Sequence, residues 1–409
     1  MGNSGGPEPA GAATPDSDVL VVGGGFAGLY AAKTAAHRGL SVTLVDAQGH
    51  QTFQPLLYQV ASGLLPVDVV DYPLHEVPGV RAVQGRVSAA DLEGRSVTLE
   101  DGSTLRGDSL ILATGASVNF YDVPGAREHA LPLYRDTDAL AIKARLLDLI
   151  AAKAAFDVVV VGAGATGIEI TGALGDVVRT VLPRTYPDFS GESVTIHVVD
   201  HASAPLAHMS TASQAYAQRV LEQAGVVFHL GSNVARVDEG SVTLDGGASM
   251  RADMVIWAAG VRARPPVMSP APAAGSDGRV AIDSTLRIPG HPRVFCIGDC
   301  AADPAHPLPQ LGSVAKQQGI HVGHSLGRMR HGHEPKPFSY RDLGTMAMLR
   351  HDRAVVEAGR HHHQIDGVAA YAMWLGLHAA LLPDDHDRVE AVHAWIDEAT
   401  TRRSRFLRD

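Results

Sequence analysis

The stretch VLVVGGGFAGLYAAKTA at residues 19–35 decides the fold. It opens with a short apolar run that ends in glycines, which is typical of a buried parallel strand. The alanine-rich residues that follow have helical spacing and predict a helix. A second copy, VVVVGAGATGIEITGAL, starts at Val158, 139 residues after Val19. Two strand–turn–helix units of this kind predict an α/β protein with two Rossmann-like dinucleotide-binding domains.

The glycines of the first copy follow the pattern G-x-G-x-x-G, in which each has a physical task. Gly23 permits a tight turn, Gly25 lets backbone amides approach a pyrophosphate, and Gly28 lets the helix pack closely on the strand. The start of the helix offers unpaired N–H groups and the positive end of its dipole to the phosphates. The next apolar strand ends in Asp46, whose carboxylate would accept hydrogen bonds from a ribose. The expected nucleotide-binding residues of this copy are Gly23, Gly25, Phe26, Ala27, Gly28 and Asp46.

The second copy carries the same glycine pattern, but its acid lies farther along the chain. Asp200 ends the next apolar strand, 33 residues after Gly167. Two prolines within residues 179–187 predict that a loop insertion supplies the excess. A duplicated half-domain that has lost its ligand is the alternative, and the complete pattern favours a bound dinucleotide. The expected nucleotide-binding residues of this copy are Gly162, Gly164, Gly167 and Asp200.

The composition excludes several classes of function. The chain has 409 residues, a formal net charge of −10 and 5% aromatic residues, which together argue against a nucleic-acid binder. Two cysteines are too few for a disulfide framework and favour a reducing compartment. No uncharged apolar run reaches the length of about 18 residues that a membrane span needs. Residues 1–17 are rich in glycine, proline, serine and alanine, and we expect a disordered leader rather than a secretory signal.

Two further apolar strands end in short motifs that complete the pattern. Residues 110–115 read LILATG, and residues 294–299 read VFCIGD. With the two glycine patterns, and in this order, they resemble the flavoproteins with two dinucleotide-binding domains. The resemblance extends over about residues 18–345.

The resemblance implies two cofactors and some of their contacts. FAD would occupy the first domain, with Asp299 bonded to its ribityl chain. NADH would bind the second domain, where IWAAG at residues 256–260 is the matching strand end. The contacts implied in this way are Thr114, Gly115, Asp299 and Ala315 for FAD, and Gly260 for NADH.

The string FQPLLYQVASG at residues 53–63 narrows the family. It resembles the flavin-side segment of the type II NADH dehydrogenases, the single-subunit, non-pumping NADH:quinone oxidoreductases. Three other segments match the same family: Gly-Ile-Glu at residues 167–169, WAAGV at residues 257–261 and VAKQQG at residues 314–319. The resemblance therefore implies hydride transfer from NADH to the flavin and electron transfer to a quinone.

The cysteines are predicted to take no part in this transfer. Disulfide reductases of this fold place a cysteine pair in the segment after the first acid, and residues 50–63 contain none. Electrons therefore cannot leave through a thiol relay at that position. Cys296 and Cys300 flank the Gly-Asp motif, and we interpret them as a buried strand residue and a loop residue.

The family resemblance also implies the residues that carry the reaction. Glu169 would face the nicotinamide and the flavin, and the helix that starts near Ala315 would stabilise negative charge on the flavin. The family normally has Ala-Gln before this helix, where this chain has Gly312-Ser313. This departure predicts a weakened quinone site. The expected catalytic residues are Glu169 and Gln317, and the expected substrate-binding residues are Gln54, Pro55, Ser313 and Lys316.

The C-terminal region leaves three roles open. Residues 367–382 are apolar but too short to span a membrane. A second helix would place an apolar stripe on one face, made of Val389, Val392, Trp395, Ile396 and Ala399. Such a region could contact a membrane surface, pack on its own domain, or join two copies in a homodimer. The histidines at residues 361–363 follow a predicted strand at residues 354–359 and indicate a hairpin turn rather than a metal site.

These observations predict an FAD domain at residues 18–125 and 270–345, an NADH domain at 126–269 and a C-terminal region from 346. The protein would be cytoplasmic or peripheral on the inner face of a membrane. It would prefer NADH to NADPH, because Asp200 would repel a 2′-phosphate. Two alternatives remain open: a flavin oxidoreductase with a non-quinone acceptor, and an FAD- and NADH-binding redox sensor without turnover.

Overall fold

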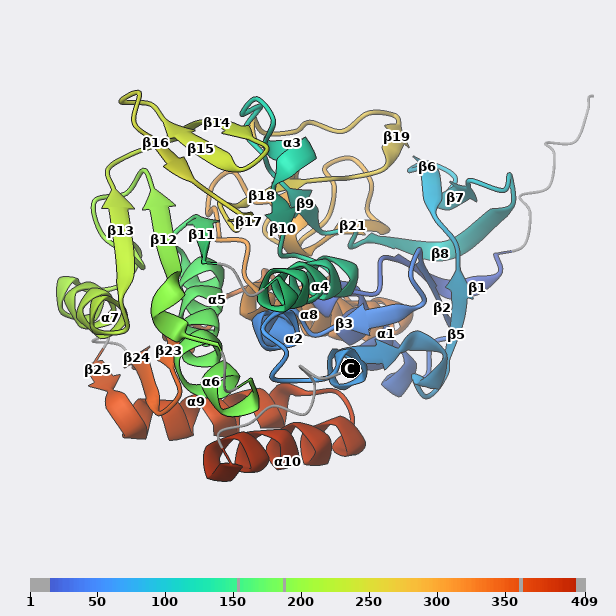
Figure 1. The fold of residues 1–409 in the computed structure, drawn as a ribbon. Helices are drawn as coiled ribbons and strands as arrows, with labels where there is room; N and C mark the ends of the chain where they lie inside the picture. Colours follow the sequence, from blue (N-terminus) through green and yellow to red (C-terminus); the bar gives the residue numbers. More distant parts are fainter. Residues whose placement is uncertain (1–14, 153–154, 187–188, 360–362, 402–409) are drawn as a thin grey trace, which may run out of the picture. The chain divides into compact units, whose positions relative to one another are not determined.

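The computed structural model describes residues 15–152, 155–186, 189–359 and 363–401 (Figure 1). The chain divides into two compact units. The first unit comprises Met1–His50, Pro73–Ala116 and Ala263–Tyr340. The second unit comprises Gln51–Tyr72, Ser117–Arg262 and Arg341–Asp409. Most of the expected leader lies outside the described residues.

The first unit is built on an eight-stranded sheet with a parallel centre. Its central strand β1 (Ser17–Val22) lies between β2 (Val42–Asp46) and β8 (Thr104–Leu112). The apolar residues of β1 are buried, as the glycine-terminated run predicted. Parallel partners on both sides explain why the strand is apolar throughout rather than alternating. The other strands of this sheet are β5 (Val80–Gln84), β6 (Val87–Asp91), β7 (Ser96–Leu99), β19 (Val267–Ser269) and β21 (Val294–Cys296).

Two long helices of the first unit pack unusually closely. Helix α1 (Phe26–His37) follows the first glycine turn and lies against α8 (Gly312–Arg330). A Cβ atom at Gly319 would lie 2.2 Å from the carbonyl oxygen of Ala27. A Cβ atom at Gly323 would lie 2.5 Å from the Thr34 side chain. Glycine at these two positions therefore allows α8 to approach the helix that begins the nucleotide turn.

The second unit contains a five-stranded parallel sheet in the order β10-β17-β11-β12-β13. Helix α5 (Ala165–Asp176) leaves β11 at the second glycine turn (Figure 1). The parallel sheets of both units confirm the predicted α/β fold. The strands of this sheet are β10 (Leu131–Pro132), β11 (Phe156–Val161), β12 (Val194–Asp200), β13 (Val226–Leu230) and β17 (Met254–Trp257).

The predicted loop insertion at residues 179–187 is wrong for the residues that the structure describes. Helix α5 continues through one wide turn (Val177–Val181) into α6 (Leu182–Thr185). Pro183 lies in the first turn of α6, where a missing N–H group breaks no hydrogen bond of that helix. A proline therefore marks the start of a helical turn here rather than a loop.

The C-terminal region forms an antiparallel sheet followed by two helices. Strand β24 (Arg353–Ala358) confirms the predicted strand, while His361 and His362 lie outside the described residues. None of the helices in the described ranges is long and apolar enough to cross a membrane. The remaining elements of this region are β23 (Thr345–Arg350), β25 (His363–Asp366), α9 (Gly367–Leu381) and α10 (Asp385–Thr401).

The remaining helices and strands complete the two units. The helices are α2 (Leu57–Ala61), α3 (Ala126–His129), α4 (Asp136–Ala151) and α7 (Thr211–Gln223). The strands are β3 (His50–Thr52), β4 (Asp71–Pro73), β9 (Ala116–Val118), β14 (Val234–Asp238), β15 (Ser241–Leu244), β16 (Ser249–Arg251), β18 (Val261–Ala263), β20 (Val280–Ala281) and β22 (Ala301–Ala302).

Candidate active site

The first glycine turn has the geometry of a phosphate cradle. Gly23 has a φ angle of +99°, and a Cβ atom there would lie 2.3 Å from the carbonyl oxygen of Ala113. A Cβ atom at Gly28 would lie 1.8 Å from the carbonyl oxygen of Gly23. A Cβ atom at Gly25, in contrast, would meet no atom within 4 Å. The outer glycines are needed for packing, whereas the middle glycine faces open space at the uncapped start of α1.

Asp46 fixes the loop around this cradle. Its carboxylate accepts hydrogen bonds from the backbone N–H groups of Gly24 and Gln48, both at 2.7 Å. A third, longer bond comes from the Gly49 N–H at 3.3 Å. A carboxylate has about four acceptor sites, so these three bonds leave capacity for a ribose hydroxyl. The acid at the end of β2 is therefore held in place by the turn that it would serve.

The Gly-Asp motif after β21 lies in a short turn of the first unit. Asp299 is largely buried, and burial raises its pKa to about 6, although the Arg279 charge opposes the rise. The side-chain oxygen of Gln318 accepts a hydrogen bond of 2.7 Å from the Gly298 N–H. Sequence reasoning singled out Gln317 and missed Gln318. The signal for Gln318 was its place on the buried stripe of α8 with Ala315 and Val322.

The start of α8 presents the residues assigned to the acceptor side. The hydroxyl groups of Ser313 and Tyr340 are 3.0 Å apart. The Lys316 ammonium lies 4.4 Å from the centre of the Tyr30 ring, within the range of a cation–π contact. No side chain caps this helix at its N-terminus, so its first N–H groups still need acceptors. The predicted site residues of this unit lie at or just after the ends of β1, β2, β8 and β21, and in the first turns of α8.

The two cysteines also lie in this unit, on either side of the Gly-Asp motif. Both are buried and form no disulfide, with their sulfur atoms 3.6 Å apart. The Cys300 thiol is also 3.3 Å from the carbonyl oxygen of Ile297. The hydrogen bond with the Cys300 thiol, together with burial, raises the pKa of Cys296 well above its usual value. A thiol held in its protonated form is a poor nucleophile.

The second glycine turn repeats this geometry in the second unit. Gly162 has a φ angle of +107°, and a Cβ atom there would lie 2.5 Å from the carbonyl oxygen of Ala258. A Cβ atom at Gly167 would lie 1.8 Å from the oxygen of Gly162, whereas one at Gly164 would meet no atom within 4 Å. The middle glycine again faces open space at an uncapped helix start.

Asp200 takes the place in the second turn that Asp46 has in the first. Its carboxylate accepts hydrogen bonds from the Ala163 N–H at 2.6 Å and the Ala202 N–H at 2.7 Å. The exposed His201 ring lies 3.2 Å from the same carboxylate. Gly260 follows β17 with a φ angle of +131°, which favours glycine.

Glu169 is a buried carboxyl group of the second unit with a strongly raised pKa. It is only 9% exposed, and burial raises its pKa to about 8. Its Oε1 atom accepts hydrogen bonds from the Met348 N–H at 3.2 Å and from the Trp374 indole N–H at 3.3 Å. A carboxyl group with this pKa is mostly protonated at neutral pH and is suited to give up a proton.

Aromatic side chains surround the Trp374 indole. The His378 ring stacks on it, with ring centres 3.8 Å apart, and burial lowers the pKa of His378 to about 4. Tyr58 and Trp395 approach the indole edge-on. Sequence reasoning missed Trp374 and His378 as neighbours of Glu169. Their i, i+4 spacing in α9 was visible, but nothing in the sequence says which residue that face meets.

Gln54 and Pro55 belong to the second unit, in the short helical turn Gln54–Leu56. The Gln54 side-chain N–H donates a hydrogen bond of 3.3 Å to the carbonyl oxygen of Tyr134. The following helix α2 packs on α5, the helix that carries Glu169. The FQPLLYQVASG segment is therefore brought to the same unit as Glu169, although the chain between them includes residues of the first unit.

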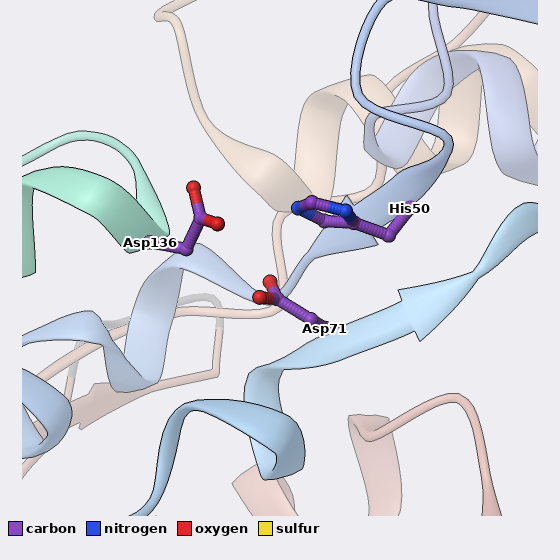
Figure 2. A group of neighbouring side chains, drawn as sticks. All are labelled: His50, Asp71 and Asp136. Carbon is purple, nitrogen blue, oxygen red and sulfur yellow. The ribbon is translucent and has the colours of Figure 1, made fainter. Parts of the chain in front are cut away.

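Two carboxylates elsewhere in the second unit also lie close together. Asp71 begins β4 and Asp136 begins α4, and each places an oxygen within 4.8 Å of the other (Figure 2). The figure also draws His50, the last residue of the first unit. The Thr52 hydroxyl donates a hydrogen bond of 2.9 Å to Asp71. Two carboxylates with protein partners are not by themselves a metal site, and we assign no ion to them.

Comparison with known proteins gives a consistent result. A family model described as pyridine nucleotide-disulphide oxidoreductase matches residues 17–319. The type II NADH:quinone oxidoreductase NdhA of Mycobacterium tuberculosis is 32% identical over 92% of this chain and 86% of its own. The type II NADH:quinone oxidoreductase Ndh of the same organism is 30% identical over 95% of this chain and 89% of its own. A solved structure of NDH2 from Plasmodium falciparum in complex with NADH has the same fold, with a TM-score of 0.86, 17% identity, and coverage of 94% of this chain and 98% of that one.

Proposed function

This chain belongs to the type II NADH:quinone oxidoreductase family, and from this premise we propose how its residues divide the oxidation of NADH and the reduction of a quinone. The observation that carries the proposal is Glu169. A buried carboxyl group with a pKa of about 8 lies two residues after the last glycine of the second turn. Quinone reduction consumes two protons with its two electrons, so a protonated acid beside the second nucleotide turn has a task.

The first unit would hold FAD. The open space at Gly25, the uncapped start of α1 and the fixed carboxylate of Asp46 fit a pyrophosphate followed by a ribose. Asp299 would accept hydrogen bonds from the ribityl hydroxyls, and Thr114 and Gly115 would line the same site. When bound, FAD supplies the redox chemistry, because it can accept a hydride and release two electrons.

The start of α8 would stabilise negative charge on the flavin of the first unit. Its uncapped N–H groups and the positive end of its dipole favour a negative charge beside Ala315. Ser313, Lys316 and Gln317, in the first two turns of this helix, would contact the quinone. Gln54 and Pro55, in the second unit, are the other residues that the family resemblance assigns to quinone binding. Family membership and the local geometry described above support these proposed contacts.

The second unit would hold NADH as a co-substrate. The space at Gly164 and the uncapped start of α5 repeat the phosphate cradle of the first unit. Asp200 would accept hydrogen bonds from the adenosine ribose and repel a 2′-phosphate, and Gly260 would lie beside the nucleotide. The enzyme would therefore prefer NADH to NADPH.

The C-terminal helices would attach the enzyme to a membrane surface. Several large apolar side chains of α9 and α10 are exposed, among them the expected stripe residues Val389, Val392 and Ile396. Trp395 of the same stripe is instead buried. A groove of about 320 Å³ between the two helices is almost wholly apolar. Exposed apolar side chains on helices too short to span a bilayer fit peripheral attachment. A homodimer contact through the same face is the competing arrangement.

Steady-state NADH oxidation with a short-chain ubiquinone analogue tests the proposal. We expect the analogue to accelerate NADH oxidation well beyond the rate with oxygen alone. Glu169→Gln should slow quinone-dependent turnover by at least about a hundredfold, the low end of what a general acid contributes. The same variant should leave anaerobic bleaching of the flavin by NADH unchanged.

The outcomes separate this proposal from its two alternatives. Rapid NADH oxidation without acceleration by quinone would favour a flavin oxidoreductase with another acceptor. Bleaching of the flavin by NADH without turnover on quinone or oxygen would favour a redox sensor. Full quinone activity in Glu169→Gln would remove the proposed role of this side chain while leaving the overall reaction intact.

A further inference from the structure

Helix α9 reaches the Glu169 carboxyl group from more than 200 residues away in the chain. The Trp374 indole N–H lies 3.3 Å from the Oε1 atom of Glu169. The Met348 N–H, from β23, reaches the same oxygen at 3.2 Å. The backbone donor is present whatever residue stands at position 348, whereas the indole donor depends on the identity of residue 374. Trp374 is therefore the partner of Glu169 that a substitution can remove.

The Trp374 indole is held in one orientation. The side chain is fully buried, and the His378 ring lies nearly parallel to it at an interplanar angle of 19°. The Nδ1 atom of His378 is 2.8 Å from the Trp374 carbonyl oxygen, which fixes the stack along the helix. Tyr58 of α2 and Trp395 of α10 contact the indole edge-on, with ring centres 6.0 and 6.2 Å away. A ring enclosed on these sides cannot turn its N–H away without disturbing its neighbours.

We propose that Trp374 is a positioning residue for Glu169, through which helix α9 holds the carboxyl group in place and sets the pH at which it releases its proton. The inference rests on the proposed function, in which Glu169 supplies a proton for quinone reduction. It adds a task for the C-terminal region besides attachment to a membrane surface. The helix that carries the exposed apolar side chains also carries a donor to the reacting acid.

The direction of the effect follows from the hydrogen bond. Burial raises the pKa of Glu169, and the bonds from Met348 and Trp374 oppose that rise because they favour the carboxylate. Removing the indole N–H should therefore raise the pKa of Glu169 further. One neutral hydrogen bond is worth on the order of 1 kcal/mol, which corresponds to a shift of about 0.5–1 pH unit.

Other titratable groups on the elements packed against Glu169 would not produce the same change in the pH profile. His378 on α9 is neutral throughout this range, because burial lowers its pKa to about 4. Arg350 of β23 is paired with Asp176 at the far end of α5, with a nitrogen–oxygen distance of 2.8 Å. Tyr58 faces the indole from α2. A change in the pH profile after removal of the indole donor would thus report on Glu169.

The test compares two tryptophan-to-phenylalanine variants of the FAD-loaded full-length enzyme. Trp374→Phe keeps an aromatic ring and loses the donor to Glu169. Trp395→Phe loses an indole donor that bonds to Gln59 at 2.7 Å and keeps an aromatic ring against the Trp374 indole, so it is the matched control. The measurement is the pH dependence of kcat with a saturating short-chain ubiquinone analogue, together with the rate of anaerobic flavin bleaching by NADH.

We expect Trp374→Phe to move the alkaline limb of the kcat profile upward by about 0.5–1 pH unit. Its kcat at neutral pH should fall roughly three- to tenfold, because the acid is less well placed and less willing to give up its proton. Flavin bleaching by NADH should stay at the wild-type rate. The Trp395→Phe control should keep the wild-type limb.

The outcomes distinguish the inference from the proposed function on which it rests. If Glu169→Gln retains the alkaline limb, the limb does not belong to Glu169 and the proposed function of this residue fails. If Glu169→Gln lacks the limb while Trp374→Phe keeps it at the wild-type pH, the positioning role of Trp374 is overturned alone. Should Trp374→Phe not retain FAD, His378→Ala decides. That variant loosens the stack and keeps the indole, and an unmoved limb there would overturn the inference.

Discussion

The two nucleotide turns are nearly identical in geometry, and the helices that leave them differ. Both first glycines have φ angles near +100°, and both third glycines would place a Cβ atom 1.8 Å from the carbonyl oxygen of the first. Counted at the same 139-residue offset, Tyr30 of α1 corresponds to Glu169 of α5. Tyr30 lies under the Lys316 ammonium, whereas Glu169 is a buried acid bonded to Trp374. The two turns share the conformation that we propose to bind phosphate, and the residues that follow them in the helices differ.

The packing of the two helices differs in a related way. In the first unit the glycine that allows close approach, Gly319, is on the incoming helix α8. In the second unit it is on α5 itself, where a Cβ atom at Gly172 would lie 1.9 Å from the carbonyl oxygen of Leu349 in β23. The incoming element is thus a strand, and an adjacent N–H of that strand, at Met348, reaches Glu169. The comparison teaches that the same turn conformation can be followed by a helix that carries a buried acid or by one that carries none at the matching position.

Substitution of the third glycine should give the largest difference between the two turns. Gly28→Val forces a side chain into the carbonyl of Gly23, and we expect loss of FAD and a colourless protein. Gly167→Val should leave FAD bound and abolish flavin bleaching by NADH, because the same clash falls in the second turn. Absorbance of the purified proteins and stopped-flow reduction measure the two effects. Gly246→Ala, where a Cβ atom meets no atom within 4 Å, is the control. Loss of FAD from Gly167→Val would show that the two turns are not independent.

The acid of the second helix should make stability depend on pH. Below pH 4.5 the Glu169 carboxyl is protonated in both the folded and the unfolded chain. Between about pH 4.5 and 8 only the unfolded chain releases the proton, so this residue lowers the free energy of unfolding as the pH rises. Glu169→Gln removes that loss. The difference in free energy of unfolding between this variant and wild type should therefore grow in favour of the variant by about 2–4 kcal/mol from pH 4.5 to pH 8. Chemical denaturation at several pH values measures the difference. The corresponding variant Tyr30→Phe retains Glu169 and should lose stability with rising pH as wild type does. An equal slope in Tyr30→Phe and Glu169→Gln would contradict the assignment.

Substitutions of the acids at the two strand ends should have different effects, one on the choice between NADH and NADPH and the other on the retention of FAD. Asp200→Ala removes the charge that would repel a 2′-phosphate, and we expect the preference for NADH over NADPH to fall by about tenfold. The matching change Asp46→Ala should instead weaken FAD retention and leave the ratio of NADH to NADPH efficiency unchanged. Stopped-flow reduction with each nucleotide and the FAD content after dialysis measure these effects. A wild-type enzyme that uses both nucleotides equally well would contradict the role of Asp200.

The smallest expected effect concerns the acceptor side of the first unit. Ser313 has a shorter reach than the glutamine that the family carries there, and one missing hydrogen bond costs about 1 kcal/mol. Ser313→Gln should lower the quinone KM about fivefold and leave flavin bleaching by NADH unchanged. Tyr340→Phe removes the partner of the Ser313 hydroxyl without lengthening the side chain, and should keep the KM within about twofold. A KM that is unchanged or higher in Ser313→Gln would argue against a quinone contact at this position.

The sequence by itself determined the features that depend on neighbouring residues. The two glycine turns, the strands before them and the acids after them could be predicted, because backbone sterics at Gly23 or Gly162 act within one strand–turn–helix unit. The proline signal at residues 179–187 misled for the same local reason. A proline is compatible with both a loop and the first turn of a helix, and only the packing around α6 selects between them.

Only the tertiary structure decided which distant residues meet. The family resemblance at residues 167–169 predicts a catalytic role for Glu169, but it could not indicate its partner Trp374, which lies 205 residues further along the chain. Likewise, Gln317 and Gln318 are neighbours in the sequence, and the facing of α8 makes Gln318 the residue that bonds to Gly298. The proton affinity of Glu169 depends on burial, and burial is a property of the assembled unit rather than of any segment. The local sequence was therefore enough to predict the two glycine turns, whereas the burial and the partners of Glu169 depend on the tertiary structure.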